Sequence, residues 1–231
     1  MFDLHGYGPS ILSGMLLTIE AALLSLVVAM ALGMLGALAK LSEWRLPRIV
    51  ATVYTTVIRG VPDLVLMLLI FFGGQVMVNQ IAPLFGYDDY IDINPFIAGV
   101  LTIGFIYGAY FAESFRGAIL AVPKGQLEAG HAFGMRPFQV FYRILLPQMV
   151  RHALPSFGNN WLVLLKTTAL LSVIGLDDMV RKASLAAGAT REPFTFYVAV
   201  AVLYLVLTTI STILLGWAER RAGVAYAVAR P

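Results

Sequence analysis

The 231-residue chain has no cysteine, and only 13% of its residues are charged. The missing cysteine excludes a disulfide scaffold, a cysteine-ligated zinc site and a cysteine nucleophile. Soluble domains carry roughly 25% charged residues, about twice the share seen here. The formal charge of +3 is too small for a dedicated nucleic-acid binder. With 59% hydrophobic residues and a mean hydropathy of +0.83, the chain reads as an integral membrane protein.

Long apolar runs are abundant, and their lengths predict membrane spans. A bilayer core about 30 Å thick needs a helix of about 20 mostly apolar residues. We therefore predict an all-α integral membrane bundle of five transmembrane helices, forming one domain over residues 1–231. The predicted spans are residues 11–39, 61–82, 95–112, 156–176 and 194–217.

The distribution of lysine and arginine predicts the orientation, because these residues concentrate in cytoplasmic loops. The first and third connections and the C-terminal tail together hold 12 basic residues, and the fourth connection holds three. This count places the N-terminus outside and the C-terminus inside. The larger set is Lys40, Arg45, Arg48, Arg59, Arg116, Lys124, Arg136, Arg143, Arg151, Arg220, Arg221 and Arg230; the smaller is Arg181, Lys182 and Arg191.

The third connection, residues 113–151, is far longer than ordinary helix–helix connections. Pro123 suits the start of a short helix, and Gly134 suits a left-handed turn that ends it. Pro137 starts a second, amphipathic helix, which Pro147 is expected to end. Such a helix pair either docks in a groove of another protein or rests on the bilayer surface.

Glycines and the outer connection allow smaller predictions. The run Gly-x-x-x-x-Gly-Lys-Ser/Thr, which cradles nucleotide phosphates, occurs nowhere in the chain. The pairs Gly33/Gly36 and Gly73/Gly74 are expected where helices approach each other closely. Residues 177–191 form either a short amphipathic helix or a solvated loop.

Ionisable residues inside the predicted spans are costly and usually face the bundle interior. Glu20, Asp63, Glu113 and Lys166 are the four candidates. They either line a translocation path or gate, with carboxylates suited to a substrate ammonium group, or Lys166 and a carboxylate form a buried pair that fixes helix packing. For Lys166 we favour the structural or gating role.

Several motifs carry a resemblance to a known family. Glu128-Ala129-Gly130, Gly134 and the run 144–147 resemble the EAA loop of ABC importer permeases. Gly130 replaces the second alanine of the motif, which should loosen the helix by about 1 kcal/mol. Residues 59–63, 115–126 and 154–170 are similar to the polar amino acid (histidine/lysine/arginine/ornithine) subfamily. The resemblance extends over about residues 16–221.

The resemblance implies a type I, MetI-like permease fold in a bacterial inner membrane. It implies an import permease for polar or basic amino acids, such as histidine, lysine, arginine or ornithine. It also implies that the EAA loop couples a partner's ATP hydrolysis to transport, without any catalysis by this chain. The docking residues would be Lys124, Glu128, Ala129, Gly130, Gly134 and Arg136; path or gate residues would be Glu20, Arg59, Asp63, Glu113 and Lys166.

The partners that the resemblance implies are a homologous permease, an ATP-binding cassette ATPase dimer, an extracytoplasmic amino-acid-binding protein and membrane lipid, with no nucleic acid. No cofactor is expected in this chain, because ATP and magnesium would bind to the ATPase. The alternatives are a permease for opines or another polar amino acid, and a secondary transporter. Five spans are few for a paired-repeat transporter.

Overall fold

The computed structural model describes residues 4–223, and Arg230 of the predicted basic tail lies outside them. Helices account for nearly all of this part of the chain, and it contains no strand, which confirms the all-α prediction. The elements in chain order are α1 (Gly8–Leu41), α2 (Arg45–Gly60), α3 (Asp63–Ile81), η1 (Ala82–Phe85), α4 (Pro95–Leu120), α5 (Lys124–Ala132), α6 (Pro137–Val140), η2 (Phe141–Leu145), α7 (Leu146–Thr167), η3 (Thr168–Ser172), α8 (Met179–Thr190) and α9 (Pro193–Arg221).

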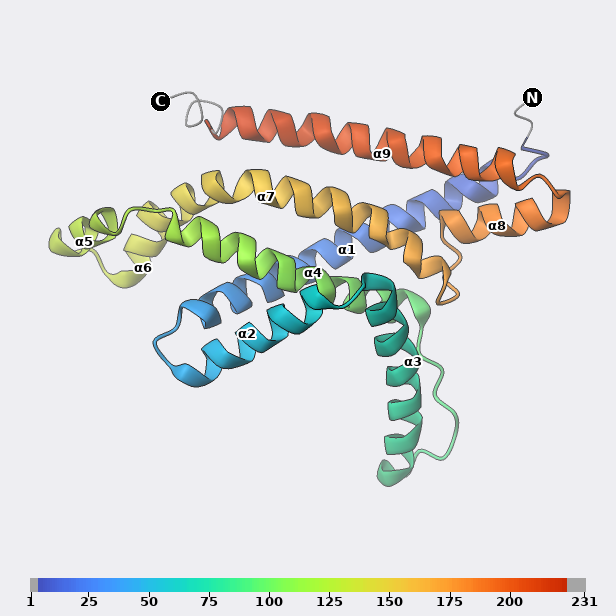
Figure 1. The fold of residues 1–231 in the computed structure, drawn as a ribbon, viewed down its shortest axis with the longest axis horizontal. Helices are drawn as coiled ribbons and strands as arrows, with labels where there is room; N and C mark the ends of the chain where they lie inside the picture. The colour runs from blue at the N-terminus through green and yellow to red at the C-terminus, as the bar shows by residue number, and fades with distance from the viewer. Residues whose placement is uncertain (1–3, 224–231) are drawn as a thin grey trace.

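Helices α1, α4, α7 and α9 run along one common direction and form the body of the molecule (Figure 1). The closest packing is between α1 and α4. A Cβ atom at Gly33 would lie 2.5 Å from Cβ of Phe111, and one at Gly36 would lie 2.9 Å from Cβ of Ala112. These distances confirm the predicted close approach. At Gly73 and Gly74 no atom would lie within 4 Å of an added Cβ, so no helix of the same chain approaches α3 at these glycines.

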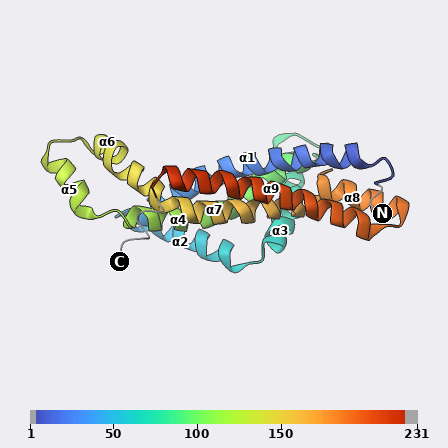
Figure 2. The same ribbon diagram turned by 90° about the horizontal axis from the view of Figure 1, so that it is seen from above.

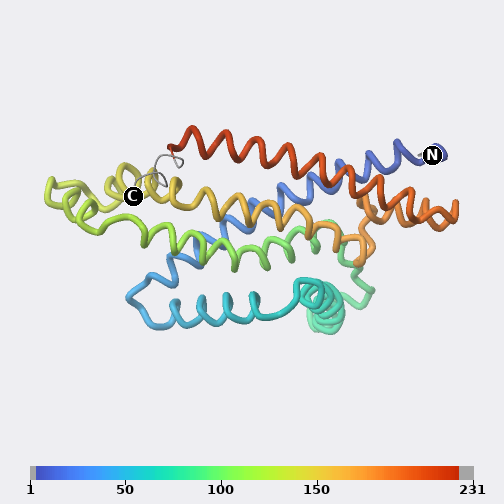
Figure 3. The backbone as a smooth tube through the Cα atoms, turned by 45° about the horizontal axis from the view of Figure 1, so that its top comes forward, coloured from blue at the N-terminus to red at the C-terminus, as the bar shows by residue number. Residues whose placement is uncertain are grey.

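Helix α2 was not predicted, since the sequence analysis treated residues 40–60 as a connection. It is strongly amphipathic: Ala51, Thr55 and Ile58 are buried, whereas arginines and apolar side chains occupy its exposed surface. Its composition is too polar for a hydropathy search to detect as a span. Arg59 lies in the last turn of this helix, so it is part of α2 rather than of an irregular connection, and α2 runs beside the other helices (Figure 3).

Helix α3 satisfies the length and apolar composition of a span, as do α1, α4 and α9 among the described residues. It nevertheless lies across the common direction of the other long helices (Figures 1 and 3). Val61 and Pro62 are extended between α2 and α3, and Pro62 cannot donate a helical hydrogen bond. This break allows the chain to change direction there.

Helix α7 begins ten residues before the predicted span and continues beyond Pro147, so the prediction that Pro147 ends a helix is wrong. The preceding turn, η2, is a π-helix, which places Pro147 in the first turn of α7. A proline is accommodated there because the π-helical turn breaks the regular register of backbone hydrogen bonds in which its N–H would be needed. Helix α4 likewise extends to Leu120, so the segment between the long helices is shorter than residues 113–151.

Different elements lie at the two ends of the molecule. Helices α5 and α6 project beyond the other helices at one end. The α1–α2 turn and the C-terminal end of α9 lie toward the same end (Figures 1 and 2). The start of α1 and helix α8 lie at the opposite end. Residues 177–191 contain helix α8, so the helix rather than the loop is confirmed for this segment.

Candidate functional site

The projecting segment is a rigid helix–turn–helix. Gly134 has φ +76°, which confirms the predicted left-handed glycine at the end of α5. The Gly134 amide donates to the His131 carbonyl at 2.9 Å, and the Met135 amide donates to the Gly130 carbonyl at 3.1 Å. This pair of bonds is the Schellman motif, which satisfies the last carbonyl groups of a helix. The turn between α5 and α6 is therefore well defined.

Gly130, one of the predicted docking residues, is buried inside this segment rather than presented on its surface. A Cβ at Gly130 would lie 2.6 Å from Cδ1 of Ile144 and 3.1 Å from Cγ2 of Val140. The glycine thus allows α5 to pack closely on α6 and η2. This packing offsets the lower helix propensity expected from the replacement of alanine.

The other predicted docking residues are exposed: Lys124, Glu128, Ala129, Gly134 and Arg136. Aromatic side chains accompany them, with Phe133 at 88% and Phe138 at 76% exposure. The sequence analysis did not place Phe133 on this surface. Exposed aromatic side chains of this kind are typical anchors in protein–protein interfaces.

A second polar site lies where α3, α4 and α7 meet. The Tyr107 hydroxyl lies 3.1 Å from Oδ2 of Asp63 and 2.6 Å from Oγ1 of Thr167. Tyr107 is almost completely buried, whereas Asp63 is half-buried at the start of α3. The structure therefore joins a predicted path residue to two residues that the sequence analysis did not select.

The guanidinium of Arg59 extends this site along α4. Its carbon Cζ lies 5.4 Å from the ring centroid of Tyr110, a cation–π contact. The Tyr110 ring in turn stacks on Tyr107, with centroids 5.4 Å apart. Arg59 and Asp63 therefore lie at one aromatic-lined site, and both keep exposed surface.

The remaining predicted path residues lie apart from this site. Glu20 and Lys166 are exposed on the surface of the single chain, on α1 and α7. Within residues 4–223 no carboxylate pairs with Lys166, so the single chain holds no buried ion pair at this residue. Glu113 lies within α4 and pairs with Lys40 and Arg116. Among residues 4–223 there is no group of three side chains that could hold a metal ion.

Asp178, just before α8, is a buried carboxylate that the sequence analysis did not identify. Its Oδ1 accepts a bond from the Arg181 amide at 2.8 Å and caps α8, but its Oδ2 has no partner among the described residues. Burial raises the pKa of Asp178 to about 6, above the usual 3.8. An ionised carboxylate that is not fully solvated destabilises the folded state.

The pH dependence of stability follows from this pKa. A carboxyl whose pKa is raised by folding binds more protons in the folded state, so its contribution to stability falls as the pH rises from about 4 to 6. We expect this group to make the protein about 1 kcal/mol more stable at pH 5 than at pH 7.5. Asp178→Asn keeps the helix cap and removes the charge. In thermal melts it should raise the melting temperature at pH 7.5 and flatten the pH dependence; an unchanged pH profile would contradict this.

Comparisons with known proteins identify the family of the chain. Residues 29–224 match the family model "Binding-protein-dependent transport system inner membrane component". The histidine/lysine/arginine/ornithine transport system permease protein HisQ of Escherichia coli is 52% identical over 96% of both chains. The octopine transport system permease protein OccQ of Rhizobium meliloti is 41% identical over 96% of this chain and 93% of its own.

Solved structures agree with these relatives. A crystal structure of an amino acid ABC transporter with histidines superposes with a TM-score of 0.78 at 35% identity, covering 93% of this chain and 95% of that one. An inward-facing structure of the MetNI methionine ABC transporter gives a TM-score of 0.68 at 17% identity, covering 93% and 94%. The second likeness concerns the fold alone.

Proposed function

Because the chain belongs to the family of binding-protein-dependent transport system inner membrane components, we propose that it is the permease subunit of an ATP-driven importer of basic amino acids. One observation carries this proposal: a rigid, glycine-capped α5 with an exposed Glu128 projects from one end of the membrane bundle. An ATPase subunit that docks on such a segment outside the membrane can transmit its movement to the membrane helices.

The relatives favour basic amino acids over opines. The histidine/lysine/arginine/ornithine permease is 52% identical to this chain, against 41% for the octopine permease and 44% for a nopaline permease of Agrobacterium fabrum. A permease for opines or another polar amino acid stays the alternative. The carboxylate of Asp63 beside the aromatic rings of Tyr107 and Tyr110 suits an ammonium or guanidinium group.

The ATPase would dock on the exposed surface of α5 and the turn after it, with Glu128 and Phe133 at its centre. A helix held between α4 and α7 moves with both, so a shift at the ATPase reaches the path. ATP and magnesium would bind to the ATPase, since this chain has no phosphate-binding loop. The chain itself would catalyse no reaction.

A homologous permease would cover the surfaces that the single chain leaves open. The apolar α3 stands away from the bundle and is largely exposed. Glu20 and Lys166 are exposed on membrane helices, where charged side chains usually face a protein interior or a water-filled cavity. A second subunit placed there would enclose the path, and a binding protein would deliver the amino acid at the end formed by α8.

The end with α5 and α6 would be cytoplasmic, because it carries most of the basic residues. The loop 86–94, with Asp88, Asp89 and Asp92, would then face outward. The cysteine-free chain allows a direct test. A cysteine at Asp89 should react with a membrane-impermeant thiol reagent in intact spheroplasts, and a cysteine at Glu128 should react only after permeabilisation; the reverse pattern would contradict this orientation.

The function is tested by purifying the chain with its partner permease and ATPase and reconstituting the complex in lipid. Binding proteins loaded with arginine, lysine, histidine or ornithine should stimulate ATP hydrolysis, and the same proteins loaded with opines should not. Stimulation by opines alone would favour the alternative substrate. A complex without ATPase bound would refute the permease assignment.

A further inference from the structure

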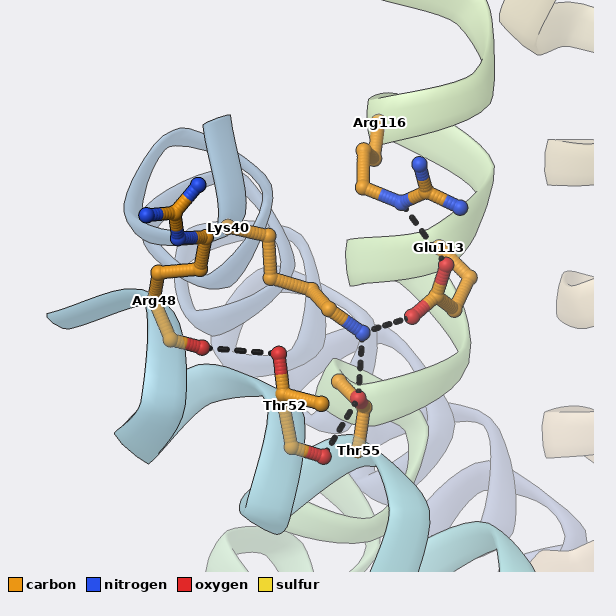
Figure 4. Close-up of polar contacts among 6 residues, drawn as sticks. All are labelled: Lys40, Arg48, Thr52, Thr55, Glu113 and Arg116. Carbon is orange, nitrogen blue, oxygen red and sulfur yellow. Dashed lines mark hydrogen bonds and ion pairs between the residues drawn. The ribbon is translucent and has the colours of Figure 1, made fainter. Parts of the chain in front are cut away.

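Three helices are joined by one polar network near the α5 end of the molecule (Figure 4). The ammonium of Lys40, at the end of α1, donates to Oγ1 of Thr55 on α2 at 2.7 Å and pairs with Oε1 of Glu113 on α4. The Nε of Arg116 donates to Oε2 of Glu113 at 3.0 Å. Both oxygens of Glu113 are therefore engaged by protein groups.

The network is largely shielded from solvent. The side chain of Lys40 is 12% exposed and that of Glu113 is 21% exposed, and Thr55 is buried. Charged hydrogen bonds are strong where solvent is excluded, and removal of one partner leaves an uncompensated charge. The network is thus a firm connection rather than a surface ion pair.

A second contact holds α2 against α4 in the same region. The Tyr54 hydroxyl donates to the Phe105 carbonyl, and a Cβ at Gly108 would lie 2.7 Å from the Tyr54 oxygen and 2.8 Å from Cβ of Leu32. The three helices are therefore also in close contact beside the network, at Leu32, Tyr54 and Gly108. Thr55 lies four positions before Arg59, which belongs to the aromatic-lined site with Asp63.

The network connects two helices that lead to different sites. Helix α4 leads through residues 121–123 into α5, whereas α2 leads through Val61 and Pro62 into Asp63 and α3. We propose that Lys40 is a positioning residue, which makes α1, α2 and α4 move as one body. Movement of α5 is then transmitted to the Arg59–Asp63 segment. The proposal rests on the proposed function, in which the ATPase docks on α5 and the substrate binds beside Asp63. It assigns Glu113 to this connection rather than to the path.

Three variants separate this role from a general charge effect. Lys40→Met removes both interhelical bonds, and Thr55→Val removes only the bond to α2 and leaves every charge in place. Arg116→Gln is the matched control, because Arg116 lies on the same helix as Glu113 and its loss breaks no interhelical contact. The three variants are compared in the complete complex in proteoliposomes.

The readout is the number of amino acids transported per ATP hydrolysed. We expect this ratio to fall at least about fivefold in Lys40→Met, within the range typical of coupling between sites. It should fall less in Thr55→Val and stay near the wild-type value in Arg116→Gln. Equal effects of Lys40→Met and Arg116→Gln, or a wild-type ratio in Thr55→Val and Lys40→Met, would overturn the proposal. Absence of ATP-driven uptake in the wild type would refute the proposed function instead.

A distance measurement gives a second readout that does not depend on activity. Spin labels on cysteines at Ile49 on α2 and Leu120 on α4 are specific, because the chain has no native cysteine. Both side chains are exposed. The label–label distance should be the same with and without ATP in the wild type and should broaden in Lys40→Met. A wild-type distance that changes with ATP would contradict a single moving body.

Discussion

Reversing the charge of Glu128 is expected to weaken ATPase docking about 100-fold and to abolish ATP-driven uptake. Glu128 is exposed on α5 and lies two residues before the buried Gly130, so the two residues occupy nearly opposite sides of the helix. The substitution Glu128→Lys leaves this internal packing intact, so it should change binding of the ATPase rather than the fold of α5. A like charge facing basic groups of a partner would repel them. Co-purification of the ATPase subunit with the tagged permease measures the loss.

The matched control is Glu43→Lys, a charge reversal at an exposed position in the α1–α2 turn at the same end of the molecule. It should leave ATPase recovery and uptake close to wild type. If both reversals act equally, the effect is one of overall charge. If Glu128→Lys retains full ATPase binding and transport, α5 does not dock through this residue.

Replacing Asp63 by asparagine is expected to lower the affinity of the permease for a cationic amino acid by about 10- to 100-fold, the usual value of a hydrogen bond to a charged group. Asparagine has the same shape and can still accept the Tyr107 hydroxyl, so the contacts among α3, α4 and α7 are preserved. Only the negative charge is lost. Binding of radiolabelled arginine to the solubilised complex without its binding protein measures the change directly.

Asp92→Asn is the control, because Asp92 is an exposed carboxylate in the loop before α4 and touches neither Tyr107 nor Arg59. It should leave arginine affinity unchanged. A loss in Asp92→Asn as large as in Asp63→Asn would indicate a general attraction by the acidic surface. Unchanged affinity in Asp63→Asn would remove Asp63 from the substrate site.

Hydrophobic length predicted the long helices that follow continuous apolar runs: α1, α3, α4 and α9. An apolar run of this length is stable in a bilayer as a helix, because a helix satisfies its own backbone hydrogen bonds. The end of α5 was also predictable, since Gly134 marks a left-handed turn. Helix α2 was missed because its exposed arginines lower its mean hydropathy, although its buried face is apolar. A test for amphipathic periodicity over residues 45–60 would have found it.

The long-range contacts could not be predicted from local patterns. Asp63 and Tyr107 are 44 residues apart, and Lys40 and Glu113 are 73 apart. Their meeting depends on how α2 and α3 turn at Pro62 and on how closely α1 packs on α4. The π-helical turn before Pro147 lies in a segment that packs on Gly130 of α5, and a proline rule applied to the sequence alone does not detect it.

The account depends on transport driven by a partner's ATP hydrolysis. The direct measurement is uptake of radiolabelled arginine into proteoliposomes that contain this chain, its partner permease and the ATPase, with the binding protein outside and ATP inside. Uptake should require internal ATP, stop when the ATPase is omitted, and be unaffected by collapse of ion gradients. Uptake by this chain alone, driven by an ion gradient without ATP, would contradict the account.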